Sequence, residues 1–184
     1  DRTNPSNPYA ASKAAAESFA LAYHKTHDVP AVITRSSNNY GPFQFPEKLI
    51  PLFITNLIEG KKVPLMWSEK NPGLNARDWL HVEDNCRAIW HVANKGTNGE
   101  VYNIPGDSEI SNLGLTGMLL FYFNKGGDMV ERIPHRKGHD FRYAMSGKKL
   151  ARLGFKPSHE FRKGLDDTCK WYIDNERWWR PLKA

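Results

Sequence analysis

The sequence has little cysteine, no long apolar run and no dense block of positive charge. Its two cysteines, Cys86 and Cys169, lie far apart and outside any Cys-x-x-Cys spacing, so they do not indicate a disulfide-rich secreted domain. No stretch of about 18 apolar residues occurs, so no membrane-spanning helix is predicted. The first residues also lack the apolar core of a signal peptide. We therefore expect a reduced, cytoplasmic protein.

Positive charge is in excess but is spread along the chain. There are 26 Lys and Arg against 20 Asp and Glu, which gives a net charge of +6. A nucleic-acid interface concentrates basic residues in a run or on one face, and no such block is found. We therefore do not predict a nucleic-acid partner. We assign much of the excess positive charge to solvated surface, and the binding of a small anionic substrate remains an alternative explanation for it.

The length and composition of the chain are typical of one folded unit. It has 184 residues, of which 40% are hydrophobic and 25% are charged. Helices are predicted over residues 7–27, 46–58, 83–94, 113–123, 147–153 and 160–177, and strands over 31–35, 63–67, 78–82, 101–104 and 129–133. Residues 36–42 are predicted to form a polar turn. Strands that alternate with helices indicate an α/β fold with parallel pairing.

Some local details of these elements can also be predicted. Asn7 is the expected cap of the first helix, with Pro8 at its first position. In the helix over 83–94, the residues predicted to face inward are Ala88, Ile89, Val92 and Ala93. Cys86 is expected to fill a small apolar space there. No metal site is predicted.

Tyr9 and Lys13 are the strongest catalytic candidates that the residues themselves suggest. They stand at i and i+4 in an Ala-rich run, so a helix places both side chains on one face. A phenol ordinarily titrates near ~10, and a neighbouring ammonium favours its anionic form. The pair is therefore a candidate for proton transfer near neutral pH. The same spacing also arises by chance in Ala-rich helices, and the spacing alone leaves that alternative open.

Several further motifs follow in order along the chain. They are Asn38-Asn-Tyr-Gly-Pro42, Pro46-Glu-Lys-Leu-Ile-Pro51, Arg77-Asp-Trp-Leu-His-Val-Glu-Asp84, Glu100-Val-Tyr-Asn-Ile104 and Gly138-His-Asp-Phe-Arg-Tyr143. With Tyr9 and Lys13, this series resembles the extended short-chain dehydrogenase/reductase family over nearly the whole chain. The first two motifs together are typical of its nucleotide-sugar dehydratase branch. The resemblance implies the C-terminal part of a Rossmann-type parallel sheet, plus the smaller substrate-binding α/β region.

The resemblance also implies NAD as the cofactor and a role for individual residues. Tyr9 matches the active-site tyrosine, Lys13 matches the lysine that holds the nicotinamide ribose hydroxyls, and Asn39 matches a further cofactor contact. Substrate-binding positions are matched by Asn38, Lys48, Leu49, Pro64, Leu65, Met66, Arg77, Asn103, Arg136 and His139. Arg77 matches an arginine at the substrate diphosphate, where a guanidinium offers paired donors. A surface ion pair between Arg77 and Asp78 stays open as the alternative.

Some parts of the sequence depart from the family pattern. The loop over residues 67–76 is longer than usual, and His135 and Lys137 stand where the pattern has Asp and Pro, which leaves the nucleotide and sugar preference open. No G-x-G-x-x-G turn occurs to hold a dinucleotide pyrophosphate. The family's Thr-Asp-Glu segment, which supplies the acid and base for elimination, is also not found. We expect the C-terminal portion of a longer enzyme, inactive alone, in which residues 1–45 end the NAD-binding half and residues 46–184 are mainly the nucleotide-sugar-binding region.

The activity that the resemblance implies is the NAD-dependent dehydration of a nucleotide sugar, with dTDP-glucose giving a 4-keto-6-deoxy product. Tyr9 would take the C4 hydroxyl proton as hydride leaves C4, water would leave across C5 and C6, and hydride would return to C6. A UDP-sugar 4-epimerase, a UDP-glucuronate decarboxylase and a non-catalytic nucleotide-sugar-binding fragment remain alternatives. Expected partners are the nucleotide sugar and either a second copy of the chain in a homodimer or the missing N-terminal half. No association with a membrane is expected.

Overall fold

The fold of this chain is known from a computed structural model, which describes residues 4–136 and 141–183. Its α-helices are α1 (Pro8–His27), α2 (Leu49–Ile58), α3 (Val82–Lys95), α4 (Asn112–Tyr122), α5 (Lys148–Arg152), α6 (Phe161–Asp174) and α7 (Glu176–Trp179). Its strands are β1 (Ile33–Ser36), β2 (Asn38–Tyr40), β3 (Val63–Met66), β4 (Ala76–His81), β5 (Val101–Ile104), β6 (Glu109–Ser111), β7 (Val130–Ile133) and β8 (Arg142–Tyr143). Two 3-10 turns, η1 (Gly127–Met129) and η2 (Arg180–Leu182), complete the described chain.

The strands pair mostly in parallel, as the sequence predicts. β1 pairs with β5, β3 with β7 and β2 with β4, all in parallel. β4 also pairs with β6 in the antiparallel sense and with β8 in the parallel sense. Because parallel strands end at the same edge, the segments that follow β3 and β7 lie next to each other. The predicted α/β class is confirmed.

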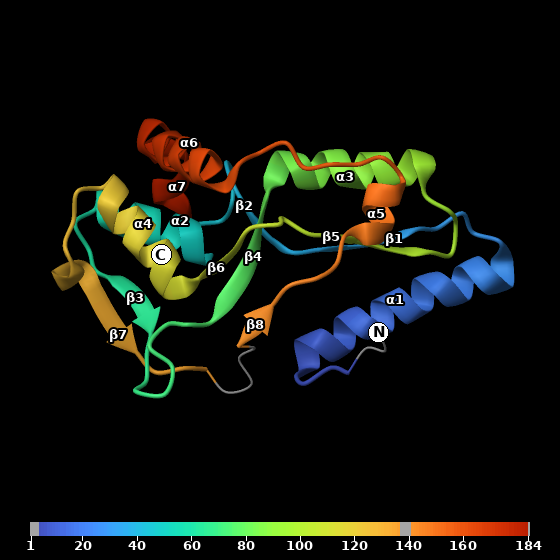
Figure 1. The fold of residues 1–184 in the computed structure, drawn as a ribbon, viewed down its shortest axis with the longest axis horizontal. Coiled ribbons are helices and arrows are strands. Elements are labelled where there is room, and N and C mark those ends of the chain that lie inside the picture. Colours follow the sequence, from blue (N-terminus) through green and yellow to red (C-terminus); the bar gives the residue numbers. More distant parts are fainter. Residues whose placement is uncertain (1–3, 137–140, 184) are drawn as a thin grey trace.

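The hydrophobic core forms two clusters, one toward each end of the molecule. Figure 1 shows α2, α4, α6 and α7 gathered at one end, α1, α3 and α5 at the other, and β4 running between them. Phe53, Leu115 and Trp179 belong to the first cluster, and Val92 and Ile104 belong to the second. Helices α3 and α5 pack beside β5, which pairs with β1, although all three come after residue 45. The division of the chain near residue 45 therefore stays a prediction.

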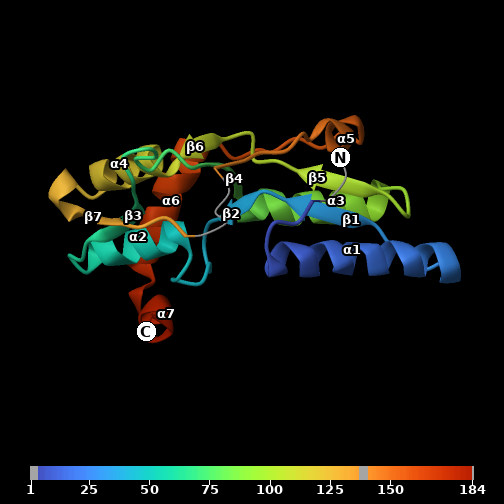
Figure 2. The same ribbon diagram turned by 90° about the horizontal axis from the view of Figure 1, so that it is seen from below.

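Helix α1 is a separate layer along one side of this arrangement (Figure 2). It begins as predicted, with the side chain of Asn7 accepting a hydrogen bond from the backbone N–H of Ala10 at 2.9 Å and with Pro8 at the first position. None of its residues is buried. The guanidinium of Arg35 on β1 donates to both carboxylate oxygens of Glu17. This ion pair links the helix to β1.

Some local predictions are wrong for reasons that lie outside the local sequence. Asn38, Asn39 and Tyr40 form strand β2 rather than part of a turn, because β4 supplies a pairing partner from much later in the chain. On α3, Ala88 is buried, but Ile89 is exposed. Ala93 and Cys86 are exposed as well, so the inward face of this helix is narrower than its apolar residues suggest.

Candidate functional site

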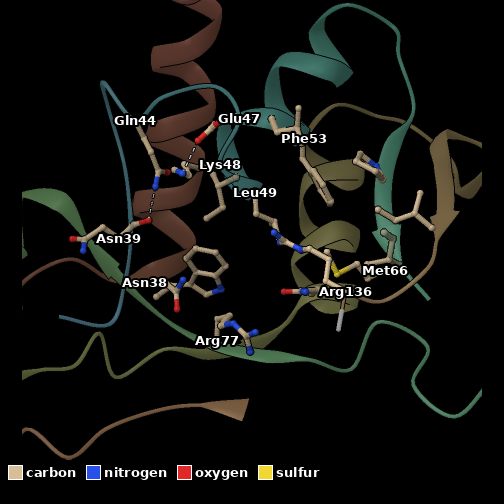
Figure 3. A pocket seen from close by; sticks show the side chains of 17 residues that line it. Asn38, Asn39, Gln44, Glu47, Lys48, Leu49, Phe53, Met66, Arg77 and Arg136 are labelled. Atoms are coloured by element: carbon tan, nitrogen blue, oxygen red, sulfur yellow. Dashed lines mark hydrogen bonds and ion pairs between the residues drawn. The ribbon is translucent and has the colours of Figure 1, made fainter. Parts of the chain in front are cut away.

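Two adjoining clefts run along the ends of the central strands. The first, which we call the α2 cleft, has a volume of about 510 Å³ and lies between α2, β2, β3 and β4 (Figure 3). The second, which we call the α1 cleft, has a volume of about 750 Å³ and lies between α1 and β1. Asn38 and Arg77 line both clefts. A ligand longer than either cleft can therefore extend from one into the other.

The α1 cleft contains the candidate proton-transfer pair. Tyr9 and Lys13 both line it, one turn apart on α1, as their spacing predicts. Tyr9 is 74% exposed, so its hydroxyl is open to a ligand. Ser36, the last residue of β1, and Ser37, which follows it, line the opposite wall, but their hydroxyl groups donate to Asn85 Oδ1 at 2.6 Å and to Asp78 Oδ2 at 2.9 Å. The cleft can therefore offer a phenol and an ammonium to a polar ligand.

An ion pair at the back of the α1 cleft holds its walls together. The Nε atom of Arg35 donates to Glu17 Oε1 at 2.9 Å, and an Nη atom donates to Oε2 at 2.5 Å. The hydrogen bond from Glu17 raises the pKa of Arg35 above its ordinary value, against the opposing effect of burial. This ion pair links α1 to β1 across the cleft. It therefore sets the distance between the helix that carries Tyr9 and the strand opposite.

The α2 cleft collects most of the predicted substrate-binding residues. Eight of the ten line it, namely Asn38, Lys48, Leu49, Pro64, Leu65, Met66, Arg77 and Arg136. Figure 3 shows Arg136 reaching between Leu49 and Met66, with Asn38 and Arg77 on the strands opposite. The basic groups face an otherwise mixed lining of apolar and amide side chains. Such a cleft suits a ligand with an anionic part and a flat or apolar part.

Three predicted site residues do not lie where their predicted roles would place them in the described structure. Asn39, predicted as a cofactor contact, lines the α2 cleft and not the α1 cleft. Asn103 lines neither cleft, and its side-chain amide donates to the backbone oxygen of Ser146 at 3.4 Å. His139 lies outside the described residues. Among the described residues, the structure therefore brings the predicted substrate-binding residues together without Asn103.

Arg77 owes its position to its neighbour on β4. Asp78 is buried, and its carboxylate accepts hydrogen bonds from Ser37 Oγ at 2.9 Å and from the backbone N–H groups of Gly106 and Ser108 at 2.8 Å each. Because Asp78 is buried, the alternative of a surface ion pair between Arg77 and Asp78 does not match the structure. Since side chains alternate along a strand, anchoring Asp78 on one face directs Arg77 to the cleft on the other.

Sequence reasoning missed four polar residues of the α2 cleft and its surroundings. Gln44, Glu47, Trp79 and Asn112 all line it, and none was singled out. For Trp79 a signal was available, because it stands two positions after Arg77 and therefore shares its face of the strand. For Asn112 there was none, since its place in the cleft depends on how α4 packs against β3.

The long loop after β3 forms a compact structure beside the α2 cleft. Ser68 and Asn71 exchange two backbone hydrogen bonds of 3.1 Å, and the Asn71 side chain donates to Asn75 Oδ1 at 2.8 Å. His135 Nε2 lies 2.9 Å from the backbone oxygen of Asn71. The loop therefore contacts the segment that carries Arg136, which is one of the cleft residues.

Among the described residues, the groups with metal-binding spacing lie away from both clefts. His81, Glu83 and His159 have ligand atoms within 4.8 Å of one another, at the start of α3. The rings of His81 and His159 are stacked at 3.9 Å with an angle of 17° between their planes, so their nitrogen lone pairs do not converge on one point. No described helix is both long and apolar enough to cross a membrane.

Comparison with known proteins agrees with the fold and with the motif series. The sequence model of the NAD dependent epimerase/dehydratase family matches residues 1–105. A dTDP-glucose 4,6-dehydratase of Streptomyces antibioticus is 50% identical over 180 residues, which is 97% of this chain and 52% of that protein. The chain spans about half the length of the curated relatives it matches.

Solved structures show the same relationship. DesIV, a dTDP-glucose 4,6-dehydratase of Streptomyces venezuelae solved with NAD and TYD bound, matches with a TM-score of 0.94 and 47% identity, over 98% of this chain and 55% of that one. A UDP-glucuronic acid 4-epimerase of Bacillus cereus matches with a TM-score of 0.86 and 25% identity, over 93% of this chain and 54% of that one. The resemblance inferred from the ordered motifs is confirmed, and this chain belongs to the NAD dependent epimerase/dehydratase family.

Proposed function

We propose that the protein dehydrates a nucleotide sugar with the help of NAD, and that the substrate is dTDP-glucose. The observation that carries the proposal is the junction of the two clefts at Asn38 and Arg77. It allows one extended ligand to reach from the basic α2 cleft to Tyr9 and Lys13. The high identity to dTDP-glucose 4,6-dehydratases supports this choice of substrate.

In this proposal the α2 cleft binds the nucleoside diphosphate. Arg77 and Arg136 both line this cleft, and their guanidinium groups form paired hydrogen bonds with phosphate oxygens. Lys48 also lines this cleft, where its ammonium pairs with Glu47 at 2.7 Å and can turn to a phosphate oxygen when the ligand binds. Leu49 and Met66 supply apolar walls on either side of Arg136 (Figure 3). The sugar then points toward the α1 cleft.

In the α1 cleft, Tyr9 acts as the base that takes the proton of the sugar C4 hydroxyl, and Lys13 places a positive charge one helical turn away in the same cleft. Lys13 and Tyr9 also fit the hydroxyl groups of a nicotinamide ribose, because both present hydrogen-bonding groups to the same open cleft. When bound, NAD supplies the chemistry of accepting hydride from C4 and returning it at C6. We assign the acid and base for loss of water to the family's Thr-Asp-Glu segment, which does not occur in this sequence.

The proposal extends to the setting of the reaction. We assign the protein to the cytoplasm and to a homodimer or an association with an N-terminal half that carries the dinucleotide cradle. The chain alone is proposed to be inactive, since neither cleft contains a Gly-rich turn for the pyrophosphate.

The experiment is to incubate the full-length protein with dTDP-glucose and NAD and to follow the sugar by mass spectrometry and NMR. The expected product is lighter by one water and carries a ketone at C4 and a methyl group at C5. UDP-glucose and UDP-glucuronate are the matched alternatives. Epimerisation or decarboxylation of a UDP-sugar, or no loss of water with any nucleotide sugar, would contradict the proposal.

A further inference from the structure

The long loop that follows β3 is anchored to the body of the protein through its asparagines. The side chain of Asn71 donates to Asn75 Oδ1 at 2.8 Å and accepts from the backbone N–H of Leu74 at 2.8 Å. Asn75 is buried, and its backbone oxygen accepts from the N–H of Asn112, the first residue of α4, at 2.9 Å. The backbone around Asn71 is therefore held in a fixed place relative to α4.

This loop runs beside the segment that leads to Arg136. Strand β7 ends at Ile133, whose backbone oxygen accepts from the N–H of Trp67 at 2.8 Å. Further along the same segment, His135 Nε2 lies 2.9 Å from the backbone oxygen of Asn71. The loop therefore contacts the chain from the end of β7 up to the residue directly before Arg136.

His135 is the donor in its contact with the loop. A carbonyl oxygen can only accept a hydrogen bond, so Nε2 of the ring carries the hydrogen. The same oxygen of Asn71 also accepts from the backbone N–H groups of Ser68 at 3.1 Å and Gly73 at 2.9 Å. Its position is thus set within the loop and does not depend on His135. The loop is the fixed partner, and His135 is the group that it holds.

Arg136 depends on this anchor because its own side chain has none. It is exposed and reaches between Leu49 and Met66 in the α2 cleft (Figure 3). Within residues 4–136 and 141–183, its guanidinium forms no hydrogen bond or ion pair. A ligand that binds such a side chain has to order it, which costs conformational entropy. A backbone already fixed at the preceding residue lowers that cost.

We propose that His135 is a positioning residue for Arg136. By donating to the oxygen of Asn71, it ties the end of β7 to the long loop and presents the guanidinium to the phosphate groups of the ligand. His135 itself does not line the α2 cleft. The inference rests on the proposed function, because it takes Arg136 to bind a diphosphate.

The same hydrogen bond gives a common role to two departures from the family pattern. The loop over residues 67–76 is longer than usual, and His135 stands where the pattern has Asp. One departure supplies the acceptor of the hydrogen bond and the other supplies its donor. An ionised Asp at position 135 could only accept, and would face a carbonyl oxygen that also only accepts.

The test measures the binding of dTDP and of thymidine, which has no phosphate, to the full-length protein by calorimetry. His135→Phe keeps an aromatic ring and removes the donor. It should weaken dTDP by about 5-fold and leave the affinity for thymidine unchanged. His135→Gln carries an amide donor that can reach the same oxygen, and should restore the affinity for dTDP.

His91→Phe is the matched control. The Nε2 atom of His91 also lies 2.9 Å from a backbone oxygen, that of Leu153, and His91 lines neither cleft. Its replacement removes the same kind of hydrogen bond from another part of the molecule. Both affinities should therefore stay at their wild-type values.

A double-mutant cycle shows whether His135 acts through Arg136. Arg136→Met should weaken dTDP by about 10-fold on its own. Adding His135→Phe should then have no further effect, because no guanidinium is left to position. In turnover of dTDP-glucose, His135→Phe alone should raise KM and leave kcat near its wild-type value, since Tyr9 and Lys13 lie in the α1 cleft.

The outcomes separate this inference from the proposed function. If the wild type binds dTDP and His135→Phe binds it equally well, the inference is overturned and the proposed function stands. The inference also fails if His135→Phe weakens thymidine as much as dTDP, if it weakens dTDP equally in the Arg136→Met background, or if His135→Gln does not restore binding. If the wild type binds no nucleoside diphosphate, the proposed function fails first and takes the inference with it.

Discussion

Asn38 and Arg77 stand on adjacent parallel strands, and their side chains line both clefts of the molecule. Asn38 on β2 pairs with Trp79 on β4. Arg77 stands two positions before Trp79 on β4, so its side chain lies on the same face of the sheet as those of Trp79 and Asn38. This places a neutral amide and a permanent positive charge at the junction between the two clefts. In the proposed reaction, the diphosphate passes this point.

Replacing Arg77 by methionine should weaken dTDP binding strongly, because the charge and the paired donors are lost while an unbranched apolar side chain remains. We expect a Kd about 10- to 100-fold higher in calorimetry at low salt. Arg152→Met, at an exposed position on α5, is the matched control for the loss of one positive charge. Equal affinities for the two variants would remove Arg77 from the binding site.

Tyr9→Phe removes one hydroxyl group from an exposed side chain and should abolish turnover with little effect on dTDP binding. We expect kcat to fall by at least about 100-fold, since general acid–base catalysis contributes a factor of this size. The Kd for dTDP should stay the same, because Tyr9 lines the α1 cleft only. Tyr23→Phe, also exposed and on the same helix, is the control and should keep full activity. A Tyr9→Phe enzyme with normal kcat would rule out the proton-transfer role.

Glu17→Gln tests whether the ion pair with Arg35 positions the helix that carries Tyr9. The change should lower the free energy of unfolding by about 1 kcal/mol, because the charge-assisted pair becomes a single neutral hydrogen bond. Turnover should fall more than dTDP affinity, since α1 has no buried residue to hold it in place. Asp167→Asn breaks an exposed pair with Lys163 and should change neither quantity measurably. Loss of stability without loss of turnover would show that the pair is only structural.

The pH dependence of stability should depend on Asp84, which is 1% exposed. Burial alone would raise the pKa of this carboxyl group, but hydrogen bonds from the backbone N–H groups of His159 and Ser158 and from their side chains lower it to about 2. Because the ordinary value is about 3.9, the folded state holds the carboxylate form more tightly than the unfolded state does. The stabilisation is therefore complete above about pH 4 and is lost as the pH falls toward 2, by about 2 kcal/mol.

Urea unfolding at stepped pH measures this dependence. The wild type should lose stability between about pH 4 and pH 2, and Asp84→Asn should be less stable at neutral pH with a flatter dependence in that interval. Asp128→Asn, at an exposed position, should follow the wild-type curve. A wild-type curve and an Asp84→Asn curve of the same slope would contradict the assignment.

Much of the fold could be predicted because its signals are local. Asn7 and Pro8 mark the start of α1, and the buried residues Ile50, Phe53 and Leu57 follow one stripe of α2. Strand β2 could not be predicted in the same way. Its residues Asn38 and Asn39 are ordinary turn formers, and only pairing with β4 makes them a strand.

The candidate site shows the same division. Tyr9 and Lys13 could be placed in one cleft from helical spacing alone, and the family resemblance supplied Arg77 and Arg136. Asn112 could not be found, because its place in the α2 cleft depends on how α4 packs against β3. Asn103 shows the reverse case, since its motif predicts substrate contact but its side chain lies outside both clefts.

The central claim is an oxidation at C4 followed by a reduction at C6 of the same sugar, and isotope transfer tests it most directly. The full-length protein is incubated with dTDP-glucose that carries deuterium at C4 and with unlabelled NAD. The account predicts a 4-keto-6-deoxy product with deuterium in its C6 methyl group, and no product from the Tyr9→Phe variant. A product without deuterium at C6, or a sugar recovered with its deuterium still at C4, would contradict it.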